Sequence, residues 1–248
     1  YLDHNATTPI ASQVRHAMLP FLAEYYGNPS SMHSMGRICN EAIEDARGHM
    51  AAAIGAEREE IVFTSGGTES NNLALKGVML RDVPSVEGHL VISAFEHPAI
   101  GRPAEYLGRL GVAISEIGCD RNGVVDPDDV RKAIRPDTRL VSIMHANNEI
   151  GTVQPIREIA GICHEHGVLM HTDAAQSLGK IPVNVGSLGV DLLSIAGHKF
   201  CAPKGIGALF VGENVSFEPL FHGAGHEQGM RSATENVPFI VTNGAAGV

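Results

Sequence analysis

Short apolar segments alternate with longer segments of helical periodicity along most of this 248-residue chain. Several of the short segments are apolar nearly throughout, which is typical of strands that helices cover on both faces. In the longer segment Glu41–Ile54, apolar residues recur close to the helical period. The alternation predicts an α/β domain with a mainly parallel sheet flanked by helices. We expect strands at Glu60–Thr64, His89–Ala94, Arg139–Met144, Val168–Thr172, Asp191–Ile195 and Ile206–Val211, and further helices at Asn72–Leu80, Pro127–Ile134 and Ile156–His166.

Polar sequences follow five of the expected strands directly. In chain order they are TSGGTESNN, FEHPA, HANNEIG, TDAAQS and AGHKF. In open α/β sheets, ligands bind outside the carboxyl ends of the strands. Because the carboxyl ends of parallel strands share one edge of the sheet, we expect these five segments to converge on one site.

The first of these segments, Ser65-Gly66-Gly67-Thr68, has the features of a phosphate site. A strand, two glycines and a helix that begins near Thr68 would leave free backbone N–H groups at a positively polarised helix start. It is neither a P-loop nor a GxGxxG fingerprint. A tight turn with Thr68 as the helix N-cap explains the same residues, so this segment alone leaves both interpretations open.

Asp173 and Lys199 are each expected at the end of a strand, 26 residues apart. A lysine that forms a Schiff base and an aspartate that pairs with the pyridinium nitrogen are what pyridoxal phosphate requires of a protein. A structural ion pair is the better explanation for any random Asp and Lys. The phosphate loop, the aspartate and the lysine together favour the cofactor.

The remaining polar residues at this edge suit the same ligand. His97 can stack on the ring or move protons near neutral pH. Asn148 and Gln176 are neutral groups suited to hydrogen bonding the phenolic oxygen of the ring. His198 can donate a hydrogen bond to the phosphate. Histidines in such places are more often hydrogen-bonded bystanders, so these roles depend on the neighbouring motifs.

With these motifs in place, the chain resembles the NifS/IscS group of cysteine desulfurases in the class V aminotransferase family, to which selenocysteine lyases are related. The resemblance runs from YLDHNATTP at the N-terminus to RSATEN at Arg231–Asn236. Between them, NPSSMHSMGR, FTSGGTESNN, EHPA, NNEIGTVQPI, HTDAAQSLGKIPV and GHKFCAPKGIGAL occur in the family's order. The resemblance implies an aminotransferase-like fold (PLP fold type I) and a homodimer with active sites at the dimer interface.

The resemblance also implies roles for individual residues. Lys199 and His97 are the expected catalytic residues, and Asp173 pairs with the pyridine nitrogen. Thr234 is expected to reach the phosphate in the partner subunit. The cofactor contacts expected for pyridoxal 5'-phosphate are Gly67, Thr68, His97, Asn148, Asp173, Gln176, His198, Lys199 and Thr234.

The implied reaction converts L-cysteine to L-alanine. The amino group of the substrate replaces Lys199 on the cofactor, and a catalytic cysteine of the enzyme, acting as a thiolate, then takes the substrate sulfur as a persulfide. A sulfur-acceptor protein would carry this sulfur to iron–sulfur clusters or thiolated products.

The chain departs from the family pattern at three places. Ala196 replaces a common serine near the phosphate, and Ala233 replaces a glycine before Thr234. The family's catalytic cysteine and the arginine for the substrate carboxylate lie in a C-terminal segment beyond Val248. We therefore expect residues 1–12 to form an N-terminal segment on the small-domain side and residues 13–248 the cofactor-binding large domain, without the C-terminal small domain.

The cysteines do not supply an obvious nucleophile or metal site. Cys201 lies beside Lys199, whereas family nucleophiles lie on a movable loop, so a catalytic role for it is disfavoured. Cys39 and Cys163 lie in expected helices, as small buried hydrophobic residues do, and Cys119 lies in a turn. None of the four forms a CxxC pair. The chain has 13 histidines but no HExxH motif, so we predict no metal site.

Composition excludes several other classes. The net charge of −10 and the lack of clustered Lys and Arg argue against nucleic-acid binding. No apolar run approaches the ~20 residues of a membrane span. The N-terminus lacks a secretory signal pattern. Together with dispersed cysteines, these features predict a cytoplasmic protein.

Three alternatives to a cysteine desulfurase remain. The nearest is a selenocysteine lyase. A second is a catalytically silent scaffold that binds pyridoxal phosphate, and a third is a pyridoxal-phosphate lyase or aminotransferase that acts on another amino acid.

Overall fold

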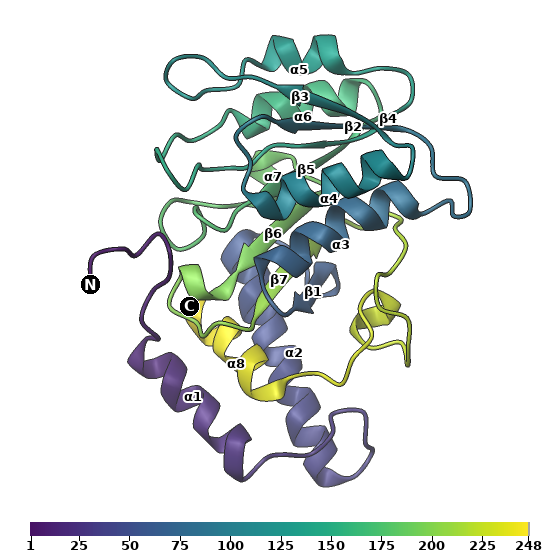
Figure 1. Cartoon of the computed structure of the whole chain (residues 1–248). Coiled ribbons are helices and arrows are strands. Elements are labelled where there is room, and N and C mark those ends of the chain that lie inside the picture. Colours follow the sequence, from purple (N-terminus) through teal and green to yellow (C-terminus); the bar gives the residue numbers. More distant parts are fainter. Residues whose placement is uncertain (248) are drawn as a thin grey trace.

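The computed structural model of the chain describes residues 1–247, and within them seven strands form one sheet in the order β1-β7-β6-β5-β4-β2-β3 (Figure 1). Six of these strands are the expected ones, within two residues at either end. The strands are β1 (Ile61–Thr64), β2 (His89–Ser93), β3 (Ala113–Ile117), β4 (Thr138–Ser142), β5 (Leu169–Asp173), β6 (Leu192–Ala196) and β7 (Gly207–Val211).

The sheet is mainly parallel, as predicted. Strand β2 pairs in parallel with β3 and β4, and the parallel run continues through β5 to β6. Strand β7 is antiparallel to both of its neighbours, β6 and β1. The carboxyl ends of β2, β4, β5 and β6 therefore share one edge.

Helices cover both faces of the sheet, as Figure 1 shows for α3 and α4 in front of it. Consecutive residues of β1 show why both faces must be apolar: Val62 packs with α3 and α4, whereas Ile61 and Phe63 pack with α2, α6 and α8. The α-helices are α1 (Ser12–Ala23), α2 (Ser34–Ile54), α3 (Gly67–Leu80), α4 (Pro98–Arg109), α5 (Pro127–Ala133), α6 (Ile156–Glu165), α7 (Val185–Leu188) and α8 (Val237–Ala246), with short 3-10 turns η1 (Arg58–Glu60), η2 (Gly197–Lys199) and η3 (Glu227–Gly229).

One strand and several helices were not predicted from the sequence. Strand β3 is a partly exposed edge strand, so its sequence lacks a continuous apolar run. Helix α4 contains Pro103 in its interior, where a proline usually breaks a helix. Helices α1, α7 and α8 were also not predicted. Helix α2 begins earlier than expected, and its N-cap is His33 rather than Ser, Thr or Asp. Helix α3 begins at Gly67, before the expected stretch Asn72–Leu80 but within one residue of the helix start expected near Thr68.

A buried ion pair fixes the glycine-rich loop of residues 222–236 against the sheet. The Arg47 guanidinium on α2 contacts the Glu227 carboxylate through two hydrogen bonds of 2.7 and 3.0 Å. The same carboxylate accepts the Phe63 N–H at 2.8 Å, and Arg47 donates to the Ile61 carbonyl at 2.7 Å. Both side chains are more than nine-tenths buried. These contacts connect the loop to helix α2 and to strand β1.

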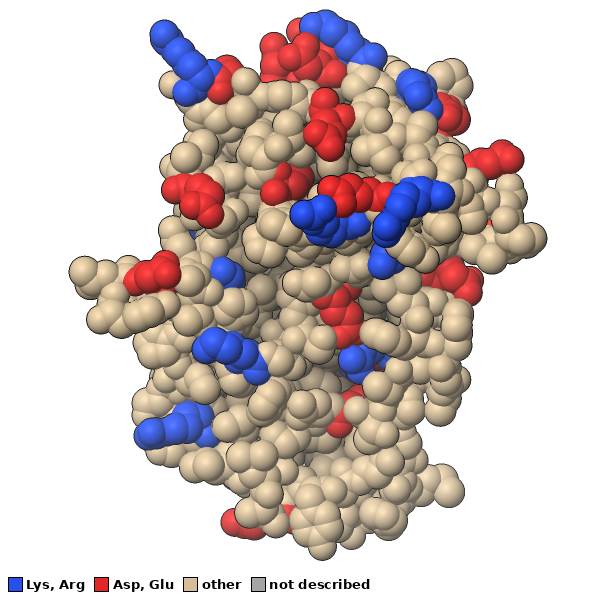
Figure 2. Space-filling view, in the orientation of Figure 1, with Lys and Arg blue, Asp and Glu red and all other residues tan. Residues whose placement is uncertain are grey.

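On the face shown in Figure 2, Lys and Arg side chains alternate with Asp and Glu side chains rather than forming one basic surface. Within residues 1–247, no helix has the length and apolarity that a membrane crossing requires.

The Arg47 pair yields a stability prediction. Arg47→Met leaves the Glu227 carboxylate buried without its cation, so the free energy of unfolding should fall by about 3 kcal/mol or more in urea titrations. The control is Arg102→Met, which breaks the exposed pair with Glu105 and should change the free energy by less than about 1 kcal/mol. Equal effects of the two substitutions would contradict the anchoring role of Arg47.

Candidate active site

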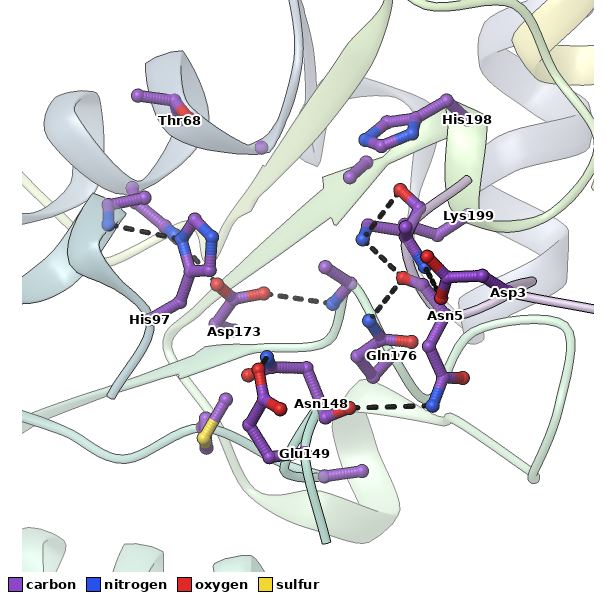
Figure 3. Close-up of a pocket in the computed structure, with 18 residues that line it drawn as sticks. Asp3, Asn5, Thr68, His97, Asn148, Glu149, Asp173, Gln176, His198 and Lys199 are labelled. Carbon is purple, nitrogen blue, oxygen red and sulfur yellow. Dashed lines mark hydrogen bonds between the residues drawn. The ribbon is translucent and has the colours of Figure 1, made fainter. Parts of the chain in front are cut away.

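A cavity of about 700 Å³ lies beyond the carboxyl ends of β2, β4, β5 and β6, where the five polar segments converge (Figure 3). Its lining contains every predicted cofactor contact except Thr234. The predicted residues that line it are Gly67, Thr68, His97, Asn148, Asp173, Gln176, His198 and Lys199.

Lys199 enters the cavity from η2, the 3-10 turn after β6, rather than from a strand end as expected. Its ammonium donates to the carbonyl oxygens of Asn5 at 2.5 Å and Ala6 at 3.1 Å. Partial burial lowers the pKa of Lys199, against the opposing charges of Asp173 and Asp3. A lowered pKa makes the neutral, nucleophilic amine easier to reach.

Asp173 is the last residue of β5 and lies on the cavity floor, 6% exposed. Its carboxylate accepts hydrogen bonds from Asn71 Nδ2 at 2.7 Å and from the Ala175 N–H at 2.9 Å. Burial nevertheless raises the pKa of Asp173, although these hydrogen bonds and the charges of His97 and Lys199 act in the opposite direction. A buried carboxylate of this kind favours a cationic ligand group beside it.

His97 caps α4 and points its ring into the cavity near Asp173 (Figure 3). Its Nδ1 accepts the Ala99 N–H at 3.1 Å. In a neutral ring the proton therefore lies on Nε2.

The start of α3 lines one end of the cavity. Gly66 precedes the helix at a φ of 149°, and Gly67 and Thr68 are its first two residues, so Thr68 is not the N-cap of the alternative interpretation. A side chain at Gly67 would come within 3.1 Å of the Ala196 Cβ. The free N–H groups and dipole of this helix start suit a phosphate.

His198 lies at the edge of the cavity, where its Nδ1 is 3.2 Å from Thr7 Oγ1. Partial burial and the charges of Lys199 and Lys204 lower the pKa of His198, so the ring is neutral near pH 7.

The N-terminal segment, which was expected only to lie on the small-domain side, also lines the cavity. Asn5 accepts a hydrogen bond from Gln176 Nε2 at 2.9 Å, and its own amide donates to the Asn148 carbonyl at 3.4 Å. Asp3 also lines the cavity. The motif YLDHNATTP was a signal for this segment, but contacts across 171 residues of sequence cannot be read from periodicity.

Two further polar residues were missed. Asn71 holds the Asp173 carboxylate, and Glu96, next to His97 in the sequence, is a half-buried residue whose carboxylate Oε2 is buried. Glu96 Oε1 accepts the Met144 N–H at 2.8 Å and the Ser93 hydroxyl at 2.5 Å, while its Oε2 has no partner among the described residues. The sequence signal for these two residues was their position in motifs that follow strands: Asn71 lies in TESNN and Glu96 in FEHPA.

Thr234 does not line this cavity. It is exposed on the glycine-rich loop, beside a second cavity lined in part by Ser65 and Arg231. Arg231 contacts the Glu69 carboxylate on α3 at 2.7 Å, and Glu69 accepts the Ser65 N–H at 2.8 Å. The loop is thus tied to the segment that opens α3.

All four cysteines are free within residues 1–247. Cys39 and Cys163 are buried, and burial raises the pKa of Cys163 to about 12, which leaves it protonated. Cys201 has a positive φ of 72° and is not among the residues lining the cavity.

Residues 1–242 match Aminotransferase class-V, and the chain belongs to this family. It is 53% identical over 247 residues to the cysteine desulfurase IscS of Dictyoglomus turgidum, covering 99% of this chain and 62% of that protein. It is 47% identical over 246 residues to the cysteine desulfurase IscS of Methanosarcina thermophila, and the match covers 99% of this chain and 61% of that protein. A solved structure described as SspA in complex with cysteine matches with a TM-score of 0.97 at 41% identity, covering 100% of this chain and 72% of that one.

The chain spans about 62% of the length of the first of these relatives. The fold is that of PLP fold type I, as predicted. Class V aminotransferases and cysteine desulfurases depend on pyridoxal phosphate.

The buried carboxyl group of Glu96 predicts how the free energy of unfolding depends on pH. Burial raises the pKa of Glu96 from 4.5 to about 8, so the folded protein holds a proton that the unfolded chain releases above pH 4.5. The free energy of unfolding should therefore fall as pH rises from 5 to 8, by about 1.4 kcal/mol per pH unit from this group.

Glu96→Gln should remove that slope from urea titrations of the cofactor-free protein. Glu105→Gln, an exposed carboxylate on the neighbouring helix α4, serves as the control and should leave the slope unchanged. An unaltered slope in Glu96→Gln would mean that Glu96 is charged in the folded state.

Proposed function

We propose that this chain forms the cofactor-binding part of a cysteine desulfurase, which converts L-cysteine to L-alanine and an enzyme-bound persulfide. One observation supports this most: Lys199, Asp173 and the start of α3 face a single cavity. An amine, a buried carboxylate and an anion site are the three groups that pyridoxal phosphate requires.

The cavity residues match the parts of the cofactor. Asp173 would hold the protonated ring nitrogen, because its raised pKa reflects a carboxylate short of a cation. Lys199 would hold the aldehyde carbon, and His97 would lie on the ring face. Thr68 and His198 would bind the phosphate with the N–H groups of Gly67 and its neighbours, while Asn148 and Gln176 would face the phenolic oxygen. When bound, pyridoxal phosphate supplies an electron sink for the bonds of the substrate α-carbon.

The chain's own residues then act by positioning and proton transfer. Lys199, with its lowered pKa, can hold or release a proton at Nζ within the cavity. His97 presents Nε2–H to the same space, because Ala99 occupies Nδ1. Asp173 stays fixed by Asn71 and Ala175 while charge develops on the ligand.

A homodimer belongs to the same proposal. Thr234 is exposed on a loop that two ion pairs hold in place, Arg47–Glu227 and Arg231–Glu69. Because the loop is held in place and Thr234 lies outside the cavity of its own chain, Thr234 is available to contact the cofactor of a partner subunit. We also propose that residues 1–12 belong to the small-domain side and residues 13–248 to the large domain; Val248 lies outside the described residues.

The sulfur released would pass to an acceptor protein for iron–sulfur cluster assembly or thiolation, in the cytoplasm. The dispersed free cysteines support a reducing compartment.

The proposal is tested on the complete protein, loaded with pyridoxal phosphate and supplied with L-cysteine and a thiol reductant. Alanine and sulfide should form in equal amounts, and Lys199→Ala should lower the rate by about 10²-fold or more. Lys132→Ala, a surface lysine paired with Asp129, is the control and should retain the rate.

Selenocysteine, assayed in parallel, distinguishes a selenocysteine lyase by a preference for the selenium substrate. Conversion of other amino acids without sulfide would indicate a different lyase or aminotransferase. Full activity in a folded Lys199→Ala variant would refute the assignment of Lys199.

A further inference from the structure

Gln176 lies between two groups that constrain its side-chain amide from opposite sides. Its Nε2 donates to the Asn5 carbonyl at 2.9 Å, and its Oε1 accepts from the Lys180 ammonium at 2.5 Å. A glutamine amide can otherwise rotate and exchange donor for acceptor. A carbonyl only accepts and an ammonium only donates, so both neighbours select the same orientation.

The local backbone places Lys180 for this contact. Gly179 adopts a positive φ of 76°, and a side chain there would approach the Phe200 Cβ to 2.9 Å. The turn ends with the Lys180 N–H on the Ser177 carbonyl, which brings the lysine beside Gln176 four residues earlier. Among residues 1–247, no carboxylate lies within ion-pair distance of Lys180, so Gln176 is its partner.

In this orientation the Gln176 amide offers the cavity a hydrogen-bond donor rather than an acceptor. One N–H of the Gln176 amide bonds to the Asn5 carbonyl, beside which Figure 3 shows the amide. The second N–H has no partner among the described residues, and because Gln176 lines the cavity, this N–H is left for a ligand. Lys180 itself does not line the cavity. We infer that Lys180 is a positioning residue: it holds the Gln176 amide so that its N–H faces the ligand oxygen and favours the anionic form of that oxygen.

This inference rests on the proposed cofactor site. The other titratable groups around this site are Lys199 and Asp3 at the mouth, Asp173 and His97 on the floor, and Glu149 and His198 at the sides. None of them contacts Gln176 through a hydrogen bond in residues 1–247. Lys180 is therefore the charged group that determines the orientation of this amide.

The test follows the visible absorption of the bound cofactor against pH in the complete protein. Lys180→Met removes one of the two contacts that fix the amide and leaves the Asn5 carbonyl as the other. The amide oxygen should then turn toward the ligand oxygen more often and disfavour the anion. The midpoint of the colour change should rise by about half a pH unit or more. Lys180→Arg keeps a cationic donor and should stay near the wild-type midpoint, as should the surface control Lys132→Met.

A double-mutant cycle separates positioning from a direct effect of the charge. In the Gln176→Ala background, Lys180→Met should move the midpoint no further. If the shift persists in full there, or if Lys180→Met alone leaves the midpoint unchanged, the inference is overturned.

If Lys180→Met binds no cofactor, the same cycle is measured on the cofactor dissociation constant. The double variant should then bind as Gln176→Ala does, and weaker binding by the double variant would overturn the inference. A wild-type protein that takes up no cofactor would instead refute the proposed function.

Discussion

The buried carboxylate of Asp173 is the constraint on which the site depends. Burial at the end of a parallel strand is unfavourable for a negative charge, and it raises the pKa of Asp173. The Asn71 amide and the Ala175 N–H satisfy the carboxylate oxygens but supply no full charge. A cationic ligand group would supply that charge, and Lys199 lines the same cavity.

The fold collects these groups because its strands are parallel and largely buried on both faces. The polar segments that follow β2, β4, β5 and β6 therefore bring His97, Asn148, Asp173 and Lys199 to one edge. The N-terminal segment closes this edge through hydrogen bonds from Lys199 and Gln176 to the Asn5 carbonyl. Binding groups thus come from a rigid sheet, and the covering segment comes from elsewhere in the chain.

The parallel sheet and most of the cavity lining could be predicted from the sequence. Each apolar strand segment ends abruptly, and a polar motif follows it directly. Strand β3 could not be predicted, because its partial exposure removes the continuous apolar run. Helix α4 could not be predicted either, because Pro103 lies within it. Asn5 and Asn71 were missed for a different reason. Their importance lies in contacts between distant segments, which only the folded chain reveals.

The central claim is that Lys199 carries pyridoxal phosphate in this cavity. The most direct measurement is borohydride reduction of the cofactor-loaded protein, followed by mass analysis of the intact chain and its peptides. We predict a phosphopyridoxyl adduct on the peptide that contains Lys199, and its loss in Lys199→Ala. An adduct mapped to another lysine, or no adduct in a protein that retains the cofactor, would contradict the account.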